Sequence, residues 1–342
     1  MRSTSRKVMV AGIGGASLGT EIGKCLALAG NYEAFGCDIS PTAYGLYDGS
    51  FKETFRIDRE NYISDVINAC HASGAIWLIA GGEQPTALLS AAEAELADHG
   101  IALVANSPEI VRLFSDKAET FRKLGAAGFP IPRTRLADGT EAIFAVGLPC
   151  IIKPATGSGG SASVFFAVTA DEAHIYADFI RRSGGVPIAQ EYVGLEEGEF
   201  TIGVLSLPDG NLAGSIALKR TLDAKLSLSY RGRGGVISSG YSQGYIGDYC
   251  SLRQQAERIA ETIGSRGPIN IQGRVRDGVL IPFEINPRFS ASTYLRALAG
   301  FNEIDIMLRF LIGGERPGLL EVKSGWYLRS LTETYVPDEG LK

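Results

Sequence analysis

The sequence is poor in cysteine and histidine. Its five cysteines lie far apart, without a CxxC pair, at Cys25, Cys37, Cys70, Cys150 and Cys250. The three histidines, at positions 71, 99 and 174, are not spaced like metal ligands. This pattern argues against both a disulfide framework and a structural zinc site. We therefore expect a soluble protein of the cytoplasm with reduced thiols.

Long apolar runs and blocks of like charge are also absent. No stretch approaches the ~18 apolar residues of a membrane span. Lysine and arginine total 33 and the acidic residues 38, which gives a net charge of −5 without a basic patch in the sequence. Such a surface does not attract nucleic acid or an anionic membrane. Residues 2–11 loosely imitate a signal peptide, but glycine follows at once and a buried strand fits better.

The remaining composition is that of an ordinary globular protein. The chain has 342 residues, of which 45% are hydrophobic and 21% charged, and this excludes wholesale disorder. At roughly 150 residues per domain, the length predicts about two domains. We find no internal repeat and no low-complexity linker.

The first third of the chain alternates short apolar strands with helices. Strands are expected at 8–12, 33–38, 75–80 and 101–105, and helices at 17–29, 62–72 and 86–99. Such alternation predicts an α/β domain with a parallel sheet and helices on both faces. Asn106-Ser107-Pro108 ends this unit, and we place the domain at residues 1–113.

Two turns in this domain lie where parallel sheets bind ligands. Residues 12–19 follow the first strand and are rich in glycine, and Asp38 ends the second strand, as in a dinucleotide site. However, Ser17 replaces the third glycine of that fingerprint, so the turn also fits a helix that packs closely on a strand. The turn at 81–86 fits either a substrate contact or a helix N-cap.

The middle of the chain contains a lysine in an apolar strand. Lys153 lies near the end of a predicted strand at 150–154, and Gly and Ser residues fill the loop at 155–161. A lysine in an apolar strand is costly unless an anion compensates its charge, and small residues allow backbone N–H groups to wrap a phosphate. The pair therefore favours phosphate binding over a flexible turn, although the loop is not a Walker motif. Lys117 opens an amphipathic helix at 117–127.

The segment 269–288 predicts a hairpin with oxygen ligands. Asp277-Gly278 is a tight-turn signal between two strand-like runs. Glu284 and Asn286 lie two residues apart and leave the same face of their strand. One carboxylate and amide oxygens suit Mg²⁺, with Gln272 as a third oxygen and Arg288 beside the bound anion. The alternative is a salt-bridged edge hairpin.

The pairing register of the two hairpin strands sets a condition on this prediction. A plain two-residue turn pairs Gln272 with Phe283, which puts Gln272 on the face opposite to Glu284. The three ligands therefore converge only if the hairpin contains a bulge or an odd-numbered turn.

Further strands are expected at 187–193, 199–204 and 212–218, in an antiparallel arrangement. Glu199 opens a β-branched strand and is the acidic residue of its turn that we expect to point inward. The stretch from 219 to 240 is rich in cations, hydroxyls and glycine. It fits either a contact with phosphates and an anionic substrate, beginning at Lys219, or a solvated loop.

Together these residues resemble the ATP-grasp superfamily, in particular the branch of the carbamoyl-phosphate synthetase large subunit and small carboxylate–amine ligases. The signs of the resemblance are Lys117, Ile151-Ile152-Lys153-Pro154 with its loop, Gln190-Glu191-Tyr192-Val193 followed by Glu199, and Phe283-Glu284-Ile285-Asn286-Pro287-Arg288. The resemblance implies a dinucleotide-fold-like N-terminal domain followed by two α+β subdomains, at 114–190 and 191–342, that grip ATP.

The resemblance also implies roles for individual residues. Lys117 and Lys153 would contact the phosphates, and backbone groups at Glu191 and Val193 would hold the adenine edge. The full nucleotide-binding set is Lys117, Lys153, Gly157, Ser158, Gly159, Gly160, Glu191, Tyr192, Val193, Glu199 and Lys219. The metal ligands would be Gln272, Glu284 and Asn286, for Mg²⁺ or Mn²⁺. Arg288 and Lys153 would be catalytic, with Arg288 stabilising an acyl phosphate.

The implied function is an ATP-dependent ligase for a small-molecule carboxylate and an amine. ATP would activate the carboxylate as an acyl phosphate, and amine attack would form a carbon–nitrogen bond. The alternatives are a carbamoyl-phosphate-synthase-like enzyme that phosphorylates a carboxylate or carbamate without ligation, a nucleotide-sensing module without turnover, and a dehydrogenase that uses the turn at 12–19. The sequence leaves a homodimer open.

Overall fold

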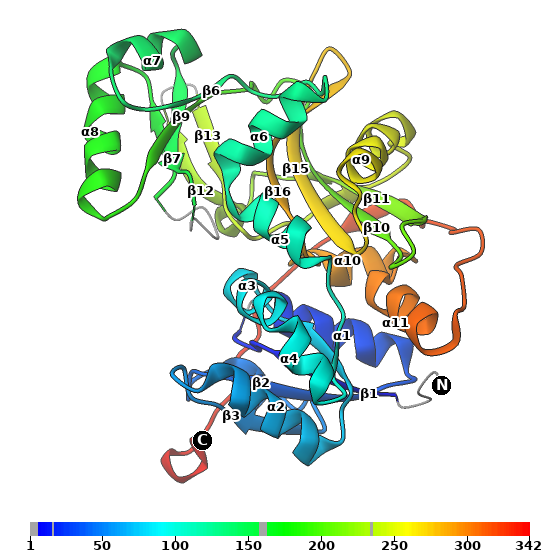
Figure 1. Cartoon of the computed structure of the whole chain (residues 1–342). Helices are drawn as coiled ribbons and strands as arrows, with labels where there is room; N and C mark the ends of the chain where they lie inside the picture. Colours follow the sequence, from blue (N-terminus) through cyan, green and yellow to red (C-terminus); the bar gives the residue numbers. More distant parts are fainter. Residues whose placement is uncertain (1–5, 16, 157–162, 233–234) are drawn as a thin grey trace.

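The computed structural model describes residues 6–15, 17–156, 163–232 and 235–342. Three larger β-sheets follow one another along the chain, and the first, a parallel sheet, has the order β3-β2-β1-β4-β5 (Figure 1). Its strands are β1 (Lys7–Ala11), β2 (Glu33–Asp38), β3 (Glu53–Arg56), β4 (Trp77–Ala80) and β5 (Ala102–Leu103). Its helices are α1 (Leu18–Ala29), α2 (Tyr62–Ser73), α3 (Glu83–Ala91) and α4 (Glu93–Asp98). The predicted parallel α/β unit is confirmed.

Two details of this unit differ from the prediction. The helix expected at 86–99 is two helices, because the chain leaves helical geometry at Ala92, and α3 begins at Glu83. The edge strand β3 was not expected, because only Phe55 among its four residues is apolar. An edge strand needs no continuous apolar run, since only one of its sides is paired.

The second sheet is antiparallel, with the order β6-β9-β7-β8. Its strands are β6 (Thr134–Leu136), β7 (Cys150–Pro154), β8 (Phe165–Ala167) and β9 (Pro187–Glu191). Helices α7 (Thr140–Val146) and α8 (Ala170–Arg182) form a separate core with these strands. Helices α5 (Pro108–Ser115) and α6 (Lys117–Ala126) connect the first sheet to this one.

The third sheet is antiparallel, with the order β16-β15-β10-β11-β14-β17. Its strands are β10 (Glu199–Ser206), β11 (Leu212–Arg220), β14 (Gly244–Ile246), β15 (Pro268–Arg276), β16 (Val279–Asn286) and β17 (Gly325–Tyr327). A two-stranded hairpin, β12 (Leu228–Gly232) and β13 (Gly235–Ser238), lies between β11 and β14 in sequence. The helices of this part are α9 (Cys250–Ile263), α10 (Thr293–Leu298) and α11 (Glu303–Gly313).

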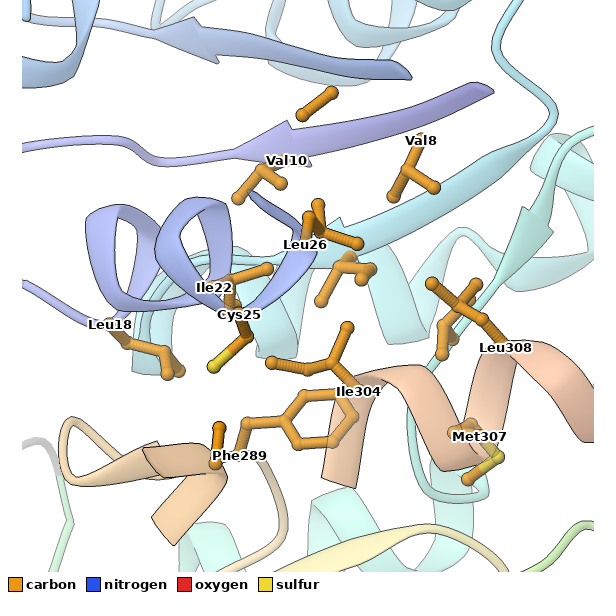
Figure 2. Packing of buried hydrophobic residues seen from close by; sticks show 14 of the residues in the cluster. Val8, Val10, Leu18, Ile22, Cys25, Leu26, Phe289, Ile304, Met307 and Leu308 are labelled. Carbon is orange, nitrogen blue, oxygen red and sulfur yellow. The ribbon is translucent and has the colours of Figure 1, made fainter. Parts of the chain in front are cut away.

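One hydrophobic core joins the first unit to the third (Figure 2). Ile22 and Leu26 of α1 pack in the same buried cluster as Ile304 and Met307 of α11. Buried apolar surface contributes roughly 25 cal/mol per Å² to folding. The parallel sheet is therefore attached by packing and not only by its linker.

The C-terminal segment returns to the parallel-sheet unit after β17 (Figure 1). Arg329 Nη2 donates to Glu21 Oε2 of α1 at 2.7 Å, and the backbone N–H of Lys342 donates to the hydroxyl of Tyr47 at 2.8 Å. These contacts fasten the end of the chain across two units. Among the described residues, no helix combines the length and apolar character needed to cross a membrane.

Candidate active site

A pocket opens between the second and third sheets and collects most of the predicted nucleotide-binding residues. The predicted residues that line it are Lys117, Lys153, Glu191, Tyr192, Val193, Glu199, Gln272 and Glu284. They come from α6, β7, β9 and its end, β10, β15 and β16. Apolar side chains complete the wall, namely Ile151, Val164, Val236, Ile237 and Phe283. The predicted residues 157–160 lie outside the described residues.

Lys153 reaches from β7 to both sides of the pocket. Its side chain is buried, and Nζ donates to Gln190 Oε1 at 2.9 Å and to the carbonyl oxygen of Phe283 at 3.0 Å. The pKa of Lys153 is lowered to about 7, mainly by burial; Glu284 opposes this shift and the nearby Lys117 adds to it. Both hydrogen-bond acceptors are uncharged, so the ammonium ion lacks a bonded counter-ion.

The hairpin of β15 and β16 contains the bulge that ligand convergence requires. Gln272 pairs with Glu284, but Gly273 pairs with Pro282, so Phe283 is the extra residue. Gln272 and Glu284 therefore share one face. The extra residue is also the one whose carbonyl oxygen accepts the hydrogen bond from Lys153. The bulge at Phe283 thus places Gln272 and Glu284 on one face and also supplies a hydrogen-bond acceptor for Lys153.

Asn286 and Arg288 lie at a neighbouring small cavity, which Glu83 and Thr86 of α3 also line. Arg288 Nη1 donates to the carbonyl oxygen of Phe289 at 3.0 Å, while its buried Nε has no partner among the described residues. Burial lowers the pKa of Arg288, and Glu284 and Glu83 oppose that shift. The turn at 81–86 therefore approaches the end of the predicted metal hairpin.

Glu199 is buried and both its oxygens are bonded to arginines. Arg220 Nη1 donates to Oε1 and Arg274 Nε donates to Oε2, each at 3.0 Å. Arg274 also donates to the carbonyl oxygens of Val193 and Val236, at 2.7 Å each. Glu199, a member of the predicted nucleotide-binding set, therefore already has two guanidinium partners.

Arg220 and Arg274 were not among the predicted binding residues. The signal for Arg274 was its position two residues after Gln272, on the same strand face. The sequence indicated a cation at this point of the chain, but the predicted set contains Lys219 and not its neighbour Arg220. The structure does not bring Lys219 to the pocket, since its Nζ lies over the Phe200 ring, 5.8 Å from the centroid, at a different groove. Neighbouring side chains of a strand point to opposite faces, and Arg220 bonds to Glu199 and Gln272, which line the pocket.

The segment 191–193 follows β9 along the pocket wall. Burial raises the pKa of Glu191, but hydrogen bonds from Arg276 and Arg133 outweigh it and hold that pKa below its ordinary value. The Tyr192 hydroxyl accepts from the N–H of Val236 at 2.9 Å. These contacts fix the backbone that was predicted to meet an adenine edge.

The candidate metal ligands supply oxygen atoms, which are the ligand type that a hard cation prefers. Among the described residues there is no group of three or more His, Cys, Asp or Glu side chains that could hold a metal ion. Glu284 supplies one carboxylate, and Gln272 and Asn286 offer amide oxygens. Such a set suits Mg²⁺ when phosphate oxygens and water complete its shell.

The glycine turn of the first unit is used for packing. A Cβ atom on Gly19 or on Gly81 would lie 1.9 Å from the carbonyl oxygen of Gly12, so both glycines permit close backbone contact. Asp38 Oδ2 accepts from the N–H of Ile13 at 2.7 Å, and Oδ1 accepts from the N–H of Ser40 at 2.9 Å. Asp38, which would hold a ribose in a dinucleotide site, instead accepts hydrogen bonds from the N–H groups of Ile13 and Ser40.

Comparisons with known proteins agree with this arrangement. A family model described as "ATP-grasp in the biosynthetic pathway with Ter operon" matches residues 189–334. The large chain of carbamoyl phosphate synthase from Beutenbergia cavernae is 24% identical over 347 residues, which cover 91% of this chain and 28% of that protein. This chain therefore spans less than a third of that relative.

Two solved structures share the fold. One is the biotin carboxylase domain dimer of 2-oxoglutarate carboxylase from Hydrogenobacter thermophilus, in complex with MgADP, ADP and bicarbonate. It has a TM-score of 0.68 at 15% identity, over 94% of this chain and 73% of that one. The other is an L-amino acid ligase from Bacillus licheniformis, with a TM-score of 0.65 at 14% identity, over 92% of this chain and 75% of that one.

The fold, a parallel-sheet unit ahead of two units that form the pocket, is shared with these two solved structures. The chain matches an ATP-grasp family model over residues 189–334 and is similar in sequence to the carbamoyl phosphate synthase large chain. The predicted fold class and the resemblance to ATP-grasp proteins are confirmed.

Proposed function

We propose that this chain is an ATP-dependent ligase that joins a carboxylate to an amine and releases ADP and phosphate. The observation that carries the proposal is Lys153, a buried amine in the pocket whose hydrogen-bond acceptors are both uncharged. A buried cation is costly without a compensating anion. A triphosphate in the pocket would provide that anion.

ATP would lie along the pocket with its phosphates toward Lys117 and Lys153. The backbone at Glu191 and Val193 would bind the adenine edge, and Glu199 would face the ribose. Apolar side chains of the same pocket would cover the base, namely Ile151, Val164, Val236 and Ile237. The paired arginines hold the Glu199 carboxylate in place for this contact.

Glu284 would be the principal ligand of a divalent cation, with the amide oxygen of Asn286 as a second ligand. When bound, the cation would neutralise charge on the transferred phosphoryl group. Arg288 would bind the acyl phosphate, and its buried Nε, which has no partner among the described residues, supports an anion there.

The chemistry requires two displacements. A carboxylate oxygen attacks the γ-phosphorus, ADP leaves, and an acyl phosphate forms. The amine nitrogen then attacks the acyl carbon, phosphate leaves with that carboxylate oxygen, and a proton passes from the amine to solvent or to a base. Positioning and charge neutralisation supply most of the catalysis, and exclusion of water protects the acyl phosphate from hydrolysis.

A second candidate is phosphorylation of a carboxylate or carbamate without ligation. The similarity to the carbamoyl phosphate synthase large chain supports it. In that case ADP would appear without any amine acceptor, and an acyl or carbamoyl phosphate would be the product.

The deciding experiment is a screen of carboxylate and amine pairs for phosphate release in the presence of MgATP, followed by the mass of the product. The active carboxylate is then labelled with ¹⁸O. The ligase predicts that one ¹⁸O atom enters the phosphate only when amide forms. Phosphate without ¹⁸O would contradict the formation of an acyl phosphate. An ¹⁸O-labelled acyl or carbamoyl phosphate that forms in the absence of an amine would select the second candidate.

A further inference from the structure

Arg220 makes five hydrogen bonds, three of them to side chains that line the pocket. Its Nη1 donates to Glu199 Oε1 and to Ser238 Oγ at 3.0 Å each, and to Gln272 Oε1 at 3.4 Å. Its Nη2 donates to the carbonyl oxygens of Ser239 and Tyr241, at 2.7 and 3.0 Å. The side chain is 1% exposed, so the guanidinium is fixed and cannot move to solvent.

Glu199 alone does not balance the charge around Arg220, and the Glu284 carboxylate also raises the pKa of Arg220 against the lowering by burial. Arg220 and Arg274 share the carboxylate of Glu199 as their bonded counter-ion. These three side chains therefore carry one excess positive charge. That charge lies beside Gln272, whose strand partner Glu284 is the carboxylate of the predicted metal site.

This arrangement disfavours a divalent cation on Gln272. Mg²⁺ binds oxygen at about 2.1 Å, and an ion on Gln272 Oε1 would lie next to a guanidinium that already donates to the same oxygen. Like charges at such a distance in a buried site repel strongly. Asn286 lies two residues beyond Glu284, on the side of the hairpin away from this contact.

We propose that Arg220 replaces a cation at the Gln272 end of the hairpin, so that the site holds one divalent ion, on Glu284 and Asn286. Gln272 then positions the guanidinium and is not a metal ligand. The inference rests on the proposed binding of a nucleotide in this pocket. It assigns to a fixed side chain part of the charge neutralisation that phosphoryl transfer needs.

The test counts metal ions on the full-length chain. Binding of the nonhydrolysable analogue AMP-PNP is first measured by calorimetry with Mn²⁺ present. The loss of the free Mn²⁺ signal in electron paramagnetic resonance is then titrated with the chain in excess over nucleotide. We expect one Mn²⁺ per bound nucleotide, whereas two would overturn the inference.

Variants separate the roles of the two side chains. Gln272→Ala should leave the Mn²⁺ dissociation constant within about threefold of the wild-type value, as should the matched exposed variant Gln254→Ala. Arg220→Gln should admit a second Mn²⁺, and Arg220→Lys, which keeps a cation, should not. A tenfold weaker Mn²⁺ affinity in Gln272→Ala, or a single ion in folded Arg220→Gln, would contradict the inference.

Folding and nucleotide binding are checked independently. Arg220 is buried, so circular dichroism and the melting temperature of its variants are compared with the wild type. If they do not fold, the wild-type ion count and Gln272→Ala still decide the question. Absence of AMP-PNP binding to the wild type would instead overturn the proposed function, and this inference with it.

Discussion

Two regions of this molecule carry sequence features of a nucleotide site, and they differ in whether their polar groups are satisfied. In the parallel-sheet unit, both Asp38 oxygens accept backbone N–H groups, and Gly19 and Gly81 pack against a carbonyl oxygen. In the pocket, Lys153 bonds only to neutral acceptors, and the nearby Arg288 has an unpartnered Nε among the described residues. Satisfied groups indicate packing, whereas buried charges without a bonded counter-ion indicate a ligand.

The largest expected effect that tests this contrast is loss of the Glu284 carboxylate. Glu284→Gln should reduce metal-dependent ATP turnover by about a thousandfold, because a metal ion supplies several kcal/mol of charge stabilisation. Steady-state kinetics over a range of Mg²⁺ concentrations measures this. Glu141→Gln, at an exposed site on α7, is the matched control and should keep full turnover. Equal rates for both variants would remove Glu284 from the metal site.

The next effect concerns Lys153. Lys153→Met should weaken AMP-PNP binding roughly 10- to 150-fold, because hydrogen bonds to charged groups contribute about 1.5–3 kcal/mol. Calorimetry measures the dissociation constant, and Lys123→Met, at an exposed position of α6, is the control. An unchanged dissociation constant in a folded Lys153→Met protein would mean that the pocket does not bind phosphates through this residue.

The parallel-sheet unit should respond in the opposite way. Asp38→Ala removes two backbone hydrogen bonds to a carboxylate, so we expect the free energy of unfolding to fall by about 2–4 kcal/mol. Urea denaturation measures this loss, while the AMP-PNP dissociation constant should stay the same. NADH should not raise the melting temperature of the wild type. A clear rise that Asp38→Ala abolishes would restore the dehydrogenase alternative.

The smallest effect is a pH dependence of nucleotide affinity. The pKa of Lys153 is about 7 in the free protein because of burial, and a bound triphosphate favours the protonated form and raises this pKa. Binding therefore takes up a proton, so affinity should be constant well below pH 7 and fall up to tenfold per pH unit above it.

Calorimetry between pH 6 and 9, in two buffers of different ionisation enthalpy, measures both the affinity and the proton uptake. Lys153→Arg should flatten the profile, because arginine stays protonated throughout this range. A flat wild-type profile would show that Lys153 is not linked to binding.

Elements bounded by strong local signals could be predicted from the sequence. The strand β7 coincides with the predicted range because an apolar run there ends in proline, and the hairpin follows from Asp277 and Gly278, which both have positive φ. The choice between Lys219 and Arg220 could not be made, because two adjacent cations leave opposite faces of a strand and only the packed sheet decides which face is inner. The expected ligand set required a bulge or an odd-numbered turn in the hairpin. The position of the bulge at Phe283 depends on tertiary contacts and could not be predicted.

The shared core of α1 and α11 has a consequence for protein engineering. A chain divided near residue 113 would leave the side chains of Ile22 and Leu26 on one fragment, and those of Ile304 and Met307 on the other, facing water. Exposed apolar faces of this kind promote aggregation. Chimeras that exchange the amino-terminal unit with that of another protein of this fold should therefore exchange α10 and α11 together with it.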